Sequence, residues 1–149
     1  MRIALAADHA GLELKNRLRS YLEQKGHELV DLGAFTAEPS DYPDFAEAIG
    51  KAIQSQTANR GVLICGSGVG ASIAANKLRG VRAGLCHDSY SARQGVEHDD
   101  MNILVLGARV IGTALAEDLV DQFLGASFSN EERHVRRLQK IERLEMSES

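Results

Sequence analysis

The sequence has few of the features on which secreted and membrane proteins depend. Its two cysteines, Cys65 and Cys86, are too few for a disulfide scaffold and favour a reducing compartment. The first apolar run is interrupted by Asp8 and His9 before it reaches the roughly 7–15 residues of a secretory signal. No segment approaches the roughly 18 apolar residues that span a membrane. We therefore expect a cytoplasmic protein that does not enter a membrane.

An excess of positive charge is missing as well. Lysine and arginine total 17 against 21 aspartates and glutamates, which gives a net charge of −4. Proteins that bind nucleic acid usually carry a basic face, so we expect no nucleic-acid partner, although local basic clusters can still bind small anions. The 149 residues, of which 44% are hydrophobic, suffice for one domain with its own core.

Proline is scarce, and both prolines lie in one loop, at positions 39 and 43. Elsewhere, short apolar runs alternate with patterns of helical period. The runs predict strands at 3–7, 28–32, 62–65, 81–86 and 102–106. Helical patterns follow them, including one that runs from a glycine-rich loop to Gly80 and a last, arginine-rich one at about 131–145. Strands that each lead into a helix predict an α/β fold, a parallel sheet with helices on both faces.

Polar residues that follow the predicted strands should gather at one edge of this sheet. In open α/β sheets, ligands bind at the carboxyl ends of the strands. Three predicted strands end next to chemically useful side chains, namely Asp8 and His9, Cys65, and Arg109. Cys86, His87 and Asp88 follow the fourth strand, and His98 to Asp100 precede the fifth. Within one chain, we therefore expect His98 at the opposite edge from Cys65.

The stretch CGSGVG, residues 65–70, predicts an anion site. Its glycines let backbone N–H groups approach a ligand, and the N-terminus of the following helix favours negative charge. Cys65 alone is compatible with a packing residue, but these N–H groups also favour a thiolate that acts as a base. Cys86 has no glycine loop after it, and we interpret it as packing. GSGVGA also matches a dinucleotide-binding pattern, with Asp88 roughly twenty residues on, but on the third strand rather than the first.

Five motifs then occur in order along the chain. They are ADHAG at 7–11, SDYPD at 40–44, CGSGVGASIAANK at 65–77, EHDDMNILVLG at 97–107 and RHVRR at 133–137. Together they resemble the type B ribose-5-phosphate isomerases, in a wider family that includes galactose-6-phosphate isomerase subunits. The resemblance covers essentially the whole chain. It implies one domain over residues 1–149, a Rossmann-like three-layer αβα sandwich with a five-stranded parallel sheet.

The resemblance also implies an activity, the interconversion of D-ribose 5-phosphate and D-ribulose 5-phosphate in the pentose phosphate pathway. This aldose–ketose isomerisation passes through a cis-enediolate and uses no metal and no cofactor. Family members act as homodimers or homotetramers whose active sites are shared between subunits. We therefore expect the helix at about 131–145 to pack at a subunit interface and His98 to reach a neighbour's site.

The catalytic roles are implied by the same resemblance. Cys65 would move a proton between C1 and C2, and Ser67 would handle the proton of O1 and O2. His98, with Asp8 nearby, would open the furanose ring. The enediolate oxygens would be stabilised by backbone N–H groups of the loop, those of Gly66, Gly68, Val69 and Gly70.

Substrate binding is implied to involve a second set of residues. Phosphate ligands are expected at His9, Arg133 and Arg137, a further substrate contact at Arg109, and a pocket residue at Tyr42. Asp99 stands where many family members have asparagine. Because a carboxylate accepts hydrogen bonds but repels phosphate, Asp99 leaves the identity of the sugar open.

Three other functions remain open from the sequence. The chain could isomerise another sugar phosphate, such as a galactose, allose or tetrose phosphate. It could be a non-catalytic sugar-phosphate-binding module, although such a module has no need of a thiol at Cys65. It could also use His98, Asp99 and Asp100 as metal ligands, but consecutive helical residues point in different directions.

Overall fold

The central feature of the fold is a parallel sheet whose strands are buried on both faces. The structure is a computed structural model that describes residues 1–147. Within these residues the sheet has five strands in the order β2-β1-β3-β5-β4, all parallel. Their bounds are Arg2–Ala7 for β1, Glu28–Asp31 for β2, Arg60–Cys65 for β3, Ala83–Leu85 for β4 and Ile103–Gly107 for β5. The predicted α/β architecture is confirmed.

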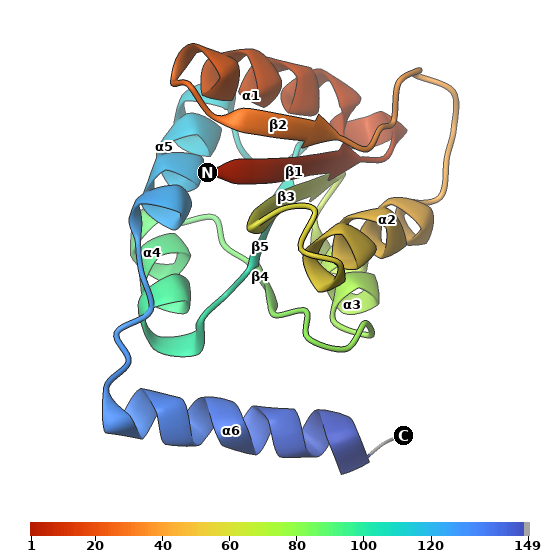
Figure 1. The fold of residues 1–149 in the computed structure, drawn as a ribbon. Coiled ribbons are helices and arrows are strands. Elements are labelled where there is room, and N and C mark those ends of the chain that lie inside the picture. The colour runs from red at the N-terminus through yellow and green to blue at the C-terminus, as the bar shows by residue number, and fades with distance from the viewer. Residues whose placement is uncertain (148–149) are drawn as a thin grey trace.

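The helices form a layer on each face of the sheet (Figure 1). One layer consists of α1 (Leu12–Gln24), α4 (Ser89–Asp99) and α5 (Thr113–Gly125). The other consists of α2 (Tyr42–Gln54) and α3 (Val69–Ala75). A short 3₁₀ helix, η1 (His9–Gly11), joins β1 to α1, and the last helix, α6 (Glu132–Ser147), lies apart from both layers (Figure 1).

Two predicted boundaries were wrong. The helix after the glycine loop ends at Ala75 rather than Gly80, because hydrogen bonds from Lys77 and Leu78 reach back only three residues and tighten the chain into turns. Gly80, at φ +80°, then reverses the chain toward β4. The fourth strand covers only 83–85 because those three residues alone pair with β5.

A buried ion pair fixes the start of the long loop that follows β2. Lys15 on α1 is fully buried, and its Nζ lies 2.6 Å from Oδ1 of Asp31 at the end of β2. The same carboxylate oxygen accepts the N–H of Gly33 at 3.0 Å. Removing one partner of a buried ion pair typically costs about 3–5 kcal/mol, because the other charge is left unpaired. Residues 32–41 therefore leave the sheet from a firmly held position.

The turn after β1 is packed directly against the backbone of β3. A Cβ atom on Gly11 would lie 2.7 Å from the carbonyl oxygen of Ile64 and 2.8 Å from its Cγ2. That oxygen also accepts the N–H of Asp8, at 3.3 Å. Only glycine fits at position 11, so the residues that follow β1 are held beside the end of β3.

Gly11→Ala should destabilise the protein. The added methyl group meets backbone that cannot move easily, and overpacking of this kind costs about 1–3 kcal/mol in the free energy of unfolding. Gly125→Ala is the matched control, since a Cβ there meets nothing within 4 Å. Urea unfolding of both variants tests this, and equal midpoints for Gly11→Ala and Gly125→Ala would contradict the packing argument.

Candidate active site

The glycine loop folds over the sulfur of Cys65. Cys65 is the last residue of β3, and its Sγ accepts the backbone N–H of Gly68 at 3.2 Å. Gly68 adopts φ +84°, and a Cβ there would lie 2.5 Å from a methyl group of Leu85. The thiol is 5% exposed, at the carboxyl edge of the sheet. An N–H donor on the sulfur stabilises negative charge there, which suits a thiolate base.

The segment after β5 holds this loop from the other side. The N–H of Ala108 donates to the carbonyl of Cys65 and that of Arg109 to the carbonyl of Gly66, both at 2.9 Å. A Cβ on Gly107 would lie 2.5 Å from the carbonyl oxygen of Ser67. His87, after β4, accepts the N–H of Gly107 at its Nε2 (3.0 Å). The sequence placed His87 at this edge without a role, and the structure makes it a support of the loop.

The turn after β1 brings two more candidates to the same edge. Asp8 is 6% exposed, and its Oδ1 accepts the N–H groups of Ala10 (3.0 Å) and Gly11 (3.2 Å). His9 is hydrogen-bonded to Ser40 through its backbone N–H and through its ring Nδ1, and Oγ of Ser40 also lies 3.5 Å from that Nδ1. Ser40 belongs to the SDYPD motif, but no feature of the sequence distinguished it from its neighbours.

Tyr42, the first residue of α2, lies against the start of α3. A Cβ on Gly70 would be 2.5 Å from Cζ of its ring, so glycine at that position lets the aromatic ring approach the loop. Ser67 is exposed and its Oγ accepts the N–H of Val69 at 3.2 Å. The structure thus brings together at one edge most of the predicted site: Asp8, His9, Tyr42, Cys65 to Gly70 and Arg109.

The remaining candidates lie at the opposite edge, where β5 begins. His98 and Asp99 end α4, and Arg133 and Arg137 lie on the first turns of α6. The ring of His98 stacks on the ring of His134, with centroids 4.0 Å apart. Within one chain, His98 and Cys65 therefore belong to different edges of the sheet, as predicted from their positions along the strands.

Charge pairing differs among the residues of this second group. Asp100 forms an ion pair with Arg82 at 3.2 Å, which turns it away from a shared ligand set with His98. Arg136 pairs with Glu132 at 2.8 Å, whereas the structure gives Arg137 no carboxylate partner within residues 1–147. Arg133 pairs with Glu131, so of the two predicted phosphate ligands on this helix, Arg137 is the one that is free to bind an anion.

His134 is a buried residue that the sequence did not single out. It is 2% exposed, and its Nδ1 lies 2.5 Å from Oγ of Ser129. Burial lowers the pKa of His134, and the nearby charges of His98 and Arg133 lower it further. The one sequence feature that pointed to His134 is its position between the two predicted phosphate ligands. The ring of His134 anchors the start of α6 against α4, where it stacks on the ring of His98.

Cys86 behaves as the sequence predicts for a packing residue. It is 7% exposed and belongs to the core beneath α4 and α5. Burial raises the pKa of its thiol to about 11, and the charge of Asp88 adds to this. Both cysteines are free, but Cys65 lies under the glycine loop and Cys86 lies in the core beneath two helices.

The structure offers no arrangement of side chains typical of a metal centre. Within residues 1–147, no three His, Cys, Asp or Glu side chains are grouped so that they could hold a metal ion. Among the described helices, none combines the length and the apolar character needed to span a bilayer.

Comparison with known proteins confirms the resemblance seen in the motifs. A family model described as Ribose/Galactose Isomerase matches residues 3–141. Ribose-5-phosphate isomerase B of Escherichia coli (strain K12) is 41% identical over 144 residues, which cover 97% of this chain and 96% of that protein. A structure of ribose-5-phosphate isomerase B from Clostridium thermocellum has a TM-score of 0.98 and 45% identity, with 100% of each chain covered. One from Mycoplasma genitalium, with bound ribulose-5-phosphate, has a TM-score of 0.92 and 39% identity, covering 97% of this chain and 96% of that chain.

Lowering the pH should loosen the anchor of α6. Because the folded-state pKa of His134 lies below its unfolded value of about 6.5, the unfolded chain takes up the proton first as pH falls. We expect the free energy of unfolding to fall between about pH 7.5 and about pH 5.5, and to fall less in His134→Asn. Urea unfolding at both pH values measures this.

The control for this measurement is His27→Asn, which removes a histidine outside the cluster of His98 and His134. It should keep the pH dependence of the wild type. An unchanged pH dependence in His134→Asn would contradict the role assigned to His134.

Proposed function

The chain belongs to the ribose/galactose isomerase family, and on that premise we propose that it interconverts D-ribose 5-phosphate and D-ribulose 5-phosphate without a metal. The observation that carries the proposal is the Cys65 sulfur, which accepts an N–H bond inside a glycine loop. Related proteins carry the name ribose-5-phosphate isomerase B, and one such structure holds ribulose-5-phosphate. A loop that only bound phosphate would gain nothing from a thiol at this position.

The proton transfer is assigned to the edge of the sheet that holds Cys65. In the open-chain sugar, the Cys65 thiolate removes the proton from C2 and returns it to C1, which converts the aldose to the ketose. The cis-enediolate formed between these steps carries negative charge on its oxygens. Backbone N–H groups of residues 66–70 stabilise that charge, and the Ser67 hydroxyl exchanges the proton between O1 and O2.

Ring opening requires a group from a second copy of the chain. His98 is the candidate acid–base residue, yet it lies at the opposite edge of the sheet from Cys65. We propose a homodimer, or a tetramer built from such dimers, in which His98 and Asp99 of one copy face Cys65 of the other. The phosphate would then meet His9 and Arg109 from one copy and Arg133 and Arg137 from the other.

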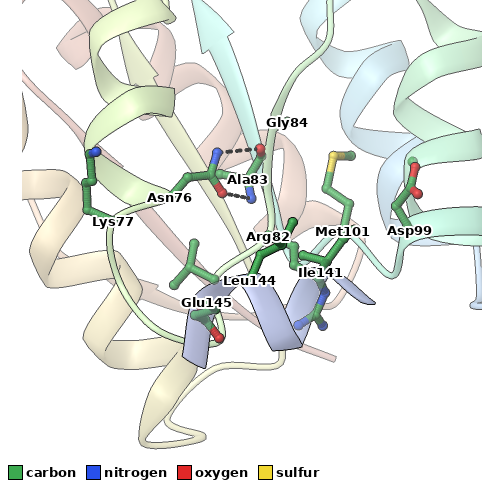
Figure 2. A pocket seen from close by; sticks show the side chains of 12 residues that line it. Asn76, Lys77, Arg82, Ala83, Gly84, Asp99, Met101, Ile141, Leu144 and Glu145 are labelled. Carbon is green, nitrogen blue, oxygen red and sulfur yellow. Dashed lines mark hydrogen bonds between the residues drawn. The ribbon is translucent and has the colours of Figure 1, made fainter. Parts of the chain in front are cut away.

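Apolar surface around α6 supports this assembly. On α6, Ile141 and Leu144 are 45% and 69% exposed, and on α3, Val69 and Ile73 are 50% and 61% exposed. A hollow of about 700 Å³ lies between α6 and β4, and Figure 2 shows Leu144 and Met101 among the side chains lining it. We propose that this surface is covered by the second copy, which places α6 at the interface.

Asp99 keeps a six-carbon sugar as the second candidate substrate. The matching family model covers galactose as well as ribose isomerases. Asp99, which follows His98 in the chain, lines the hollow beside β4 (Figure 2). Because its carboxylate only accepts hydrogen bonds, it favours a sugar hydroxyl over a phosphate oxygen. Comparing kcat/KM for ribose 5-phosphate and galactose 6-phosphate, in the wild type and in Asp99→Asn, decides between them.

We also propose a cytoplasmic location. Cys65 and Cys86 are both free and buried, and free thiols of this kind fit a reducing compartment. The net charge of −4 fits a small-molecule substrate and does not favour binding to nucleic acid.

Protein dialysed against a chelator should form ribulose 5-phosphate from ribose 5-phosphate. Cys65→Ala should lower kcat by at least about 10³-fold, because it removes the group that moves the proton. Cys86→Ala, the matched control, removes a packing thiol and should stay within about threefold of the wild type. Turnover by Cys65→Ala near the wild-type rate would contradict the assigned base.

Mixing two inactive variants should restore activity if the site is shared. Cys65→Ala and His98→Asn each disable every site, but a hybrid dimer contains one site with neither substitution. Random reassociation puts about half of the molecules in hybrids with one intact site, so about a quarter of wild-type activity should return. Activity no higher than the mean of the two separate variants would show that each site is built from one chain.

A further inference from the structure

The reciprocal hydrogen bonds between His9 and Ser40 determine more than the position of the histidine. The backbone N–H of His9 donates to Oγ of Ser40 at 3.0 Å. In the opposite direction, the backbone N–H of Ser40 donates to ring Nδ1 of His9 at 3.1 Å. The two residues are 31 positions apart in the chain. The contact therefore joins the turn after β1 to the loop that leads into α2.

The second of these bonds identifies the protonation state of the ring. A backbone N–H can only donate, so Nδ1 must accept and carries no proton. A neutral imidazole then has its single proton on Nε2, the ring nitrogen that Ser40 leaves free. An imidazolium would place an N–H on Nδ1 directly opposite the Ser40 N–H, and one of these donors would lose its partner.

We propose that Ser40 is a positioning residue that holds His9 as the neutral Nε2–H tautomer, so that His9 meets the sugar phosphate as a hydrogen-bond donor and not as a cation. The identity of the ligand rests on the proposed function, whereas the tautomer rests on the contact alone. The positive charge facing the phosphate must then come from arginines, namely Arg109 in the same chain and Arg133 and Arg137 of a second copy.

The loop around Ser40 is built to hold this contact in place. Its first residues are fixed by the Lys15–Asp31 ion pair, whose carboxylate also accepts the N–H of Gly33. Its last residue, Asp41, directly precedes α2, whose first residue is Tyr42. Ser40 thus lies two residues before the first residue of a helix whose own start packs against the glycine loop. Holding His9 also holds Tyr42 beside Gly70.

The tautomer is tested first on the free protein, with no substrate present. Long-range ¹H–¹⁵N spectra of the imidazole rings at neutral pH distinguish a protonated Nε2 from a protonated Nδ1, and the His9 signals are the ones missing in His9→Gln. We expect a single proton on Nε2. A proton on Nδ1, or on both nitrogens, would overturn the proposal whether or not the protein is an isomerase.

Substitutions of His9 distinguish a role as a hydrogen-bond donor from a role as a cation. Glutamine places an amide N–H near the position of Nε2, whereas asparagine can mimic only Nδ1. We expect His9→Gln to raise the KM for ribose 5-phosphate about threefold and His9→Asn about 10–100-fold, the loss expected for one hydrogen bond to a charged group. An equal increase in KM in both variants would show that His9 acts through its charge, and it would overturn the proposal. Dissociation constants for inorganic phosphate provide the same comparison if no sugar phosphate turns over.

The positioning role of Ser40 is tested by removing its hydroxyl group and then restoring it. Ser40→Ala removes the acceptor of the His9 N–H and should raise KM about 3–10-fold with kcat within about twofold, while Ser40→Thr restores the hydroxyl and the KM. Thr36→Ala, in the exposed part of the same loop, is the control and should match the wild type. Failure of threonine to rescue, or an equal effect from Thr36→Ala, would overturn the positioning role.

Discussion

The carboxyl end of β3 is packed so tightly that glycine is required on three sides of it. Gly11 abuts the Ile64 carbonyl, Gly68 lies against Leu85, and Gly107 lies against the backbone of Ser67. Backbone hydrogen bonds from the residues after β5 then hold the carbonyls of Cys65 and Gly66. Because the loop is confined from several directions, its backbone N–H groups are held in place before a ligand arrives, and preorganisation of this kind lowers the cost of stabilising charge in a transition state.

The division of the candidate site between two edges of the sheet follows from parallel topology. Residues that follow strands and residues that precede strands must lie at opposite edges, and no movement within the domain can bring His98 to Cys65. The proposed second copy would solve this geometric problem. Within one chain, α6 is held near its start by His134 and near its end by Glu145, whose carboxylate accepts the Gly80 N–H at 2.8 Å. Near its C-terminal end, α6 exposes the apolar side chains of Ile141 and Leu144.

Two polar side chains of the site are held by backbone N–H groups that donate to them. Asp8 accepts two backbone N–H groups, and His9 accepts one at Nδ1. In the proposed function, the groups that meet the substrate are the ring Nε2 of His9 and the thiol of Cys65, whose Sγ already accepts the Gly68 N–H. In the same proposal, positive charge comes separately from arginines, whose planar guanidinium groups suit phosphate geometry.

Much of this protein is determined by local sequence. Apolar runs and glycines identified the five strands, the loop and the edge where Cys65, Asp8 and His9 meet, because periodicity and backbone freedom depend on near neighbours. Tertiary structure decided the rest. The pairing of His9 with Ser40, the burial of Lys15 against Asp31 and the stacking of His98 on His134 join side chains from different elements. Such contacts arise only when the chain folds back on itself, so no local pattern encodes them.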